Sequence, residues 1–192
     1  MSTAANNEAA QDLALASAIF DRVATDLSLI CDRELVVESV TCERKEAKTP
    51  AAKKIHISFK LELRAPNAVL NGSLILPLPD SIALASYLMM MPDDAVKSNR
   101  NLTTLDRTMK DAMVEIGNLI GGATDAVMRE QSGGTVAARS GGCQGIRPGQ
   151  NPAFPYTAGA PLVCAKAKAR LHTLSTFEMV LQLPPVPMPE AT

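Results

Sequence analysis

The chain has 192 residues, of which 46% are hydrophobic, 20% charged and 3% aromatic, a composition typical of one globular domain with a buried core. Its 19 basic and 20 acidic residues leave a formal charge of -1, which disfavours nucleic acid and anionic membranes as partners. The longest apolar run is about half of the ~20 residues that a membrane-spanning helix needs, and no secretory signal pattern precedes Arg22, so we expect a cytoplasmic protein.

The N-terminal part of the chain predicts one helix and two strands. Residues 1–10 are rich in Ala and Asn and are expected to form a disordered lead-in. Apolar residues then recur with helical spacing over 11–31. The segment 35–41 is β-branched, and 55–63 alternates apolar and polar residues with a period of two, so both are predicted to be strands.

The middle of the chain predicts a third strand and two helices. The strand covers 68–78, and an apolar helix over 82–91 follows it. A polar linker is expected over 93–101. A long amphipathic helix then runs to about 130, with Thr103 or Thr104 as its N-cap.

The C-terminal part predicts an irregular segment, two strands and a loose tail. Residues 132–161 are rich in Gly and Pro, so we expect a long irregular loop. The strands cover 162–173 and 176–183, and the tail covers 185–192. Together, 11–184 are predicted to form a single α+β domain in which two long amphipathic helices pack on one mixed or antiparallel sheet.

The long helix carries a polar stripe beside its apolar face. The polar positions are spaced alternately by three and four, which places them on one line along the helix. They are Thr108, Asp111, Glu115, Asn118, Gly122, Asp125 and Arg129. Taken alone, such a stripe is typical of a solvated face. Glu115 and Asn118 lie one turn apart, so their side chains project in parallel.

Three glycines interrupt the middle of this helix. Gly117, Gly121 and Gly122 lower its intrinsic stability by about 3 kcal/mol relative to alanine. Glycine lets another backbone or another protein surface approach closely. We therefore predict a close contact at these positions.

The segment Asp111-Ala-Met-Val-Glu115-Ile-Gly-Asn118 resembles the signature of the CheC/CheX/FliY phosphatases of bacterial chemotaxis, and CheX in particular. That signature has Asp or Ser, three residues, Glu, two residues and Asn. The strand that contains Asn71 and the Met-rich helix over 81–91 also resemble CheX elements in the same order.

The resemblance implies hydrolysis of the aspartyl phosphate on a receiver-domain response regulator such as CheY. Asn118 would orient the attacking water, Glu115 would pair with the regulator's active-site lysine, and Asp111 would support them. The chain would need no cofactor or metal of its own, because Mg²⁺ would come with the regulator. The resemblance to CheX also suggests a homodimer.

One position departs from the family pattern, which continues with a proline where this chain has Gly141. The departure favours an alternative function, a non-catalytic binding or scaffold domain similar to the flagellar switch proteins FliM and FliN. The alternatives differ in what they require of the stripe. A phosphatase needs Glu115 and Asn118 exposed and parallel, whereas a scaffold tolerates a pair that is packed inside or covered by 132–161.

Overall fold

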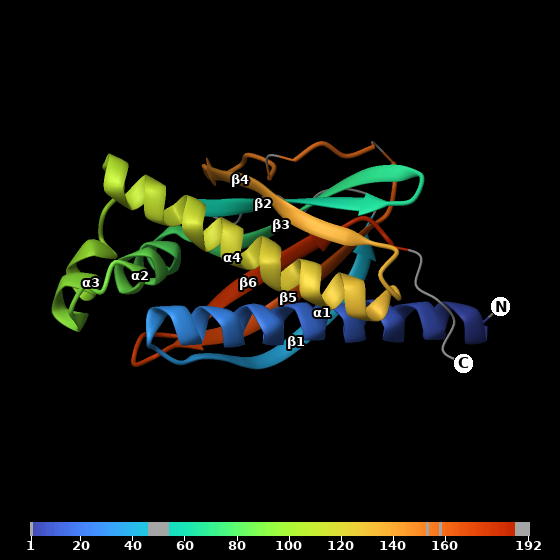
Figure 1. The fold of residues 1–192 in the computed structure, drawn as a ribbon, viewed down its shortest axis with the longest axis horizontal. Coiled ribbons are helices and arrows are strands. Elements are labelled where there is room, and N and C mark those ends of the chain that lie inside the picture. The colour runs from blue at the N-terminus through green and yellow to red at the C-terminus, as the bar shows by residue number, and fades with distance from the viewer. Residues whose placement is uncertain (1, 46–53, 153, 158, 187–192) are drawn as a thin grey trace.

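The computed structural model describes residues 2–45, 54–152, 154–157 and 159–186, which form four helices and six strands (Figure 1). The helices are α1 (Ser2–Cys31), α2 (Leu78–Leu88), α3 (Asp93–Asn99) and α4 (Arg107–Gln131). The strands are β1 (Leu35–Lys45), β2 (His56–Ala65), β3 (Ala68–Pro77), β4 (Ala137–Ile146), β5 (Leu162–Leu171) and β6 (Phe177–Leu183).

The strands form one sheet in the order β1-β5-β6-β3-β2-β4, and every pairing is antiparallel. This confirms the α+β class and selects the antiparallel form of the sheet. The register between β2 and β4 shifts opposite Lys60, where β4 contains one extra residue. The shift falls at Gly141 and Gly142, and Gly142 has a positive φ of 83°. The two glycines therefore form a β-bulge in an edge strand.

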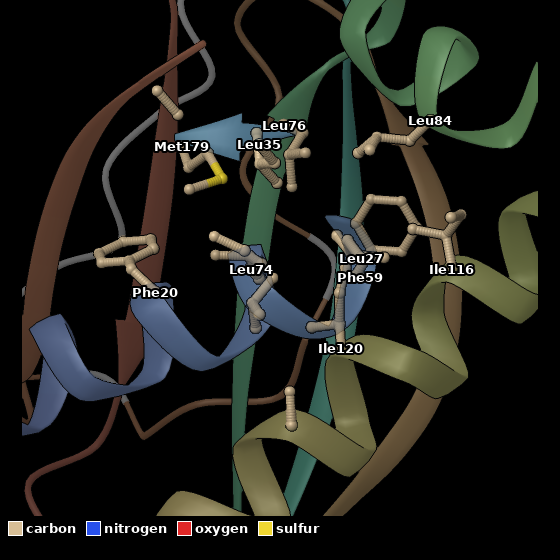
Figure 2. Close-up of a cluster of buried hydrophobic side chains, with 14 of the residues drawn as sticks. Phe20, Leu27, Leu35, Phe59, Leu74, Leu76, Leu84, Ile116, Ile120 and Met179 are labelled. Carbon is tan, nitrogen blue, oxygen red and sulfur yellow. The ribbon is translucent and has the colours of Figure 1, made fainter. Parts of the chain in front are cut away.

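The core lies between the sheet and a layer of helices on one of its faces. The two long helices, α1 and α4, lie side by side on this face, as predicted, and α2 packs beside α4 (Figure 1). The side chains that meet there include Phe20, Leu27, Phe59, Leu74, Ile116 and Ile120 (Figure 2). All six are almost fully buried, and burial of one such side chain stabilises the fold by roughly 1.5–3 kcal/mol.

Part of the opposite face of the sheet is covered by the segment between β4 and β5. Leu162 and Cys164 alternate along β5 with Ala165 and Ala167 of the main core, so they point to the opposite face. Phe154 packs with them in a second buried cluster. Phe154 therefore packs the Gly- and Pro-rich segment against this face of the sheet.

The predicted disordered lead-in is wrong for the described residues, because α1 begins at Ser2. Arg44, near the end of β1, contacts Glu8 at 2.6 Å and Asp12 at 2.5 Å. These ion pairs join the first turns of the helix to the sheet. They connect residues more than thirty positions apart, so local composition could not reveal them.

Two further predictions need correction. The irregular segment over 132–161 contains β4, whose small residues, AARSGGCQGI, hide the usual alternation of a strand. The polar linker over 93–101 contains α3, which is held by the fully buried Val96. Most of the predicted tail over 185–192 lies outside the described residues. None of the described helices has the length and apolar character that a membrane-spanning segment needs.

A partly buried ion pair joins α2 to the end of α3. The carboxylate of Asp80 is buried and contacts the guanidinium of Arg100 at 2.6 Å. Burial raises the pKa of the Asp80 carboxyl group, and Arg100 opposes this effect. The pair holds in place the segment that leads into α4.

We expect the substitution Arg100→Met to lower the free energy of unfolding by about 3 kcal/mol at pH 7, because it leaves a buried carboxylate without its cation. Urea denaturation measures this change. Adding Asp80→Asn should recover part of the loss. Lys97→Ala, at an exposed position of α3, is the control and should cost less than about 0.5 kcal/mol. If Arg100→Met were as stable as this control, the pair would not stabilise the fold.

Candidate functional site

The candidate site lies on α4, which is fixed at its start and along its apolar side. Asp106 is the N-cap, and its carboxylate accepts a hydrogen bond from the backbone N–H of Met109 at 2.8 Å. The N-cap therefore lies two or three residues later than predicted. Met113, Ile116 and Ile120 are buried in the core. Because these residues face the core, the polar stripe on the other side of α4 faces outward.

Glu115 and Asn118 are exposed and lie together on the outer face of α4. The amide nitrogen Nδ2 of Asn118 donates a hydrogen bond to Oε2 of Glu115 at 3.3 Å. Asp111, one turn earlier, is also exposed but contacts Arg107 at 3.9 Å. The structure thus brings two of the three predicted motif residues into contact and leaves the third beside them.

The end of the stripe has a structural role. The carboxylate of Asp125 accepts hydrogen bonds from Arg129 and from the backbone N–H of Ala138, both at 2.7 Å. Burial would raise the pKa of Asp125, but these two hydrogen bonds outweigh it and hold that pKa below its usual value. Asp125 therefore connects α4 to the start of β4.

One of the three glycines makes a close contact within the chain, and a second could carry a Cβ atom at ordinary van der Waals distance. A Cβ atom on Gly121 would lie 2.5 Å from the backbone nitrogen of Ser140 in β4, and one on Gly117 would lie 3.4 Å from Phe59 and Ser140. A Cβ on Gly122 would meet nothing within 4 Å. The predicted close approach is thus made by the β4 backbone at Gly121, while Gly117 is in ordinary van der Waals contact and Gly122 stays open on the exposed stripe.

Ser140 is a site-supporting residue that sequence reasoning missed. It lies beside the β-bulge at Gly141 and Gly142, and its hydroxyl accepts a hydrogen bond from the N–H of Gly142 at 3.2 Å. The signal for it was the Gly-Gly pair itself, which marks a bulge within a strand. β4 lies against the glycine side of α4 and leaves Glu115 and Asn118 uncovered.

In the described part of the chain, no group of three or more His, Cys, Asp or Glu side chains is placed to hold a metal ion. The site consists of a carboxylate and a carboxamide on a helix whose other two sides are packed. Such a pair can accept a hydrogen bond from water and can pair with a cation.

No protein-family model and no curated protein match the sequence, but solved structures match the fold. FliY from Thermotoga maritima superimposes with a TM-score of 0.70 at 16% identity, covering 93% of this chain and 90% of that one. The FliM middle domain from H. pylori gives 0.64 at 8% identity over 93% and 92%. The chemotaxis protein CheX from Desulfovibrio desulfuricans gives 0.54 at 14% identity over 88% and 98%.

These similarities define the class of protein by its fold. The chain has the fold of the CheC/CheX/FliY chemotaxis proteins, which it shares with the FliM middle domain. The resemblance that the signature on α4 indicated is thereby confirmed at the level of the fold.

The two adjacent glycines of α4 should respond in opposite ways to alanine. Gly121→Ala places a methyl group against the β4 backbone, and we expect it to lower the free energy of unfolding by about 1–3 kcal/mol. Gly122→Ala meets open space and should raise it by up to about 1 kcal/mol through helix propensity. Urea denaturation of both variants measures the difference. Equal effects would show that the close contact with β4 does not constrain the helix.

Proposed function

We propose that the chain is a CheX-like phosphatase that hydrolyses the aspartyl phosphate of a CheY-type response regulator in the cytoplasm. The observation that carries this proposal is the exposed pair Glu115 and Asn118, held in contact on one face of α4. The match of the pair to the family signature and the chemotaxis-protein fold support it.

Asn118 is proposed to orient the attacking water. A carboxylate only accepts hydrogen bonds, so the amide nitrogen of Asn118 faces Glu115 and the amide oxygen is left to accept a hydrogen bond from water. The water oxygen attacks phosphorus opposite the bond to the regulator's aspartate, and this bond breaks with the carboxylate as leaving group. An acyl phosphate has a good leaving group, so positioning the water supplies much of the catalysis.

Glu115 is proposed to pair with the active-site lysine of the regulator. The hydrogen bond from Asn118 uses one of its two oxygens, so the carboxylate retains capacity for a cationic partner. Mg²⁺ would be supplied by the regulator, and this chain would contribute no cofactor. Asp111 would support the contact from the adjacent turn, and the open Gly122 would let the regulator approach α4 closely. We further propose a homodimer with one active helix per chain.

Phosphate release tests the proposal directly. The substrates are the receiver domains of the organism's own response regulators, phosphorylated with acetyl phosphate and assayed one by one. With a receiver that the wild type dephosphorylates, Asn118→Ala should lower the rate about 100-fold, because the water loses its positioned acceptor. Glu115→Ala should also lower it, by about 10-fold or more.

The matched control is Glu130→Ala, at an exposed acidic position near the end of the same helix. It should leave the rate unchanged, and circular dichroism should show all three variants folded. The proposal fails if the Glu115 and Asn118 variants release phosphate at the wild-type rate, or if the wild type acts on none of the receivers.

The second candidate function is a non-catalytic FliM/FliN-like scaffold domain. Two observations favour it: the TM-score to the FliM middle domain exceeds that to CheX, and Gly141 replaces the family proline. A scaffold would bind a receiver without hydrolysing its phosphate. Binding by wild type with no release from any bound receiver would therefore select this function.

A further inference from the structure

Met90, at the end of α2, adopts a backbone conformation that favours glycine. The N–H of Met90 donates to the carbonyl of Tyr87 at 2.8 Å, and the N–H of Met91 donates to that of Ser86 at 3.0 Å. These two hydrogen bonds define a Schellman motif, in which Met90 occupies the left-handed position with a φ of 59°. Glycine is the usual residue there, because a Cβ atom is strained in this conformation.

The side chain of Met90 is also 92% exposed, more than any other large apolar side chain in the described residues. Methionine at this position thus has two unfavourable features, a strained backbone conformation and an apolar side chain exposed to water. Neither effect stabilises the folded chain, and glycine or asparagine would avoid both. An outlier of this kind points to a function of the side chain itself.

A groove of about 580 Å³ is lined by Met89 and Met91, the chain neighbours of Met90, while Met90 itself lies outside it. The rest of its lining is mixed: Leu102 from the segment before α4 is apolar, and Asn99 and Thr108, the latter from the first turn of α4, are among its four polar residues. The amide of Asn99 donates a hydrogen bond to the sulfur of Met91 at 3.2 Å, which fixes one wall. We call Met89, Met90, Met91, Leu102 and Thr108 the Met-rich surface.

The Met-rich surface is continuous with the polar stripe. Thr108 belongs to both, and Glu115 lies seven residues farther along α4, about 10 Å along the helix axis. Figure 1 shows α2 and the start of α4 at the same end of the molecule. A receiver-sized domain of about 100 residues has a radius of gyration of about 13 Å, so one such domain spans both.

We propose that the Met-rich surface is the apolar anchor for the receiver domain whose phosphoaspartate is placed at Glu115 and Asn118, an inference that rests on the proposed function. Exposed charges contribute little to affinity, so the stripe alone would bind weakly. Binding energy concentrates on apolar side chains that become buried in the complex. Met90 has a flexible side chain that adapts to an apolar patch on the receiver beside its phosphorylation site.

The test compares Met90→Gly and Met90→Asn with wild type. The probe is a CheY-type receiver domain of the same organism, activated with beryllofluoride for binding and phosphorylated for turnover. Both variants should raise Kd about tenfold and raise KM with kcat unchanged, because the anchor acts equally in the bound and transition states. Their Tm should equal or exceed that of wild type, because both residues fit the left-handed conformation.

The matched control is Leu29→Ser, which removes another exposed apolar side chain, 75% exposed on α1. It should leave Kd and KM unchanged. Wild-type Kd in the Met90 variants would overturn the inference, as would a fall in mass from dimer to monomer on light scattering, which would assign the surface to a second copy of this chain.

The failures of the two proposals are distinguishable. If receivers bind through Met90 but no phosphate is released, the inference stands and the phosphatase proposal fails. If phosphate is released and the Met90 variants match wild type, the inference alone fails. If no receiver binds, both are overturned.

Discussion

The close contact between α4 and β4 is the constraint on which the site depends. The helix can approach the strand this closely because Gly121 presents no side chain to the backbone of Ser140. Successive residues of a helix are rotated by about 100°, so the glycine face, the apolar core face and the polar stripe point in three different directions. Two of these faces are occupied within the chain, and the third is left for a partner.

This arrangement places the exposed pair on a rigid backbone. Glu115 and Asn118 gain no support from burial of their own side chains, but the backbone that carries them is fixed by Ile116 in the core and by Gly117 against β4. Asp125 adds a connection from the same helix to the start of the strand. Catalysis by positioning requires such a rigid support, because a small displacement of a water-orienting group reduces the rate severely.

Local patterns in the sequence predicted the candidate pair and much of the fold. The spacing of Glu115 and Asn118 placed them on one helix face, and the apolar periodicities of α1 and β2 located those elements. What the sequence could not show depends on distant partners. The start of α1 is paired with Arg44, and β4 lacks alternation because it accommodates the glycines of α4 and a bulge at Gly141. The proposed role of Met90 could be inferred only from its positive φ, which the sequence does not show.

The proposed phosphatase and scaffold functions differ in the combination of features they need. A scaffold needs an apolar surface, and the Met-rich surface beside α2 would suffice for it. It gains nothing from an exposed carboxylate and carboxamide in contact, since such groups remain solvated and contribute little affinity. A phosphatase needs both, because the polar pair acts on the phosphate and the apolar anchor brings it there. The continuity of the two surfaces through Thr108 is therefore what the proposed phosphatase would require.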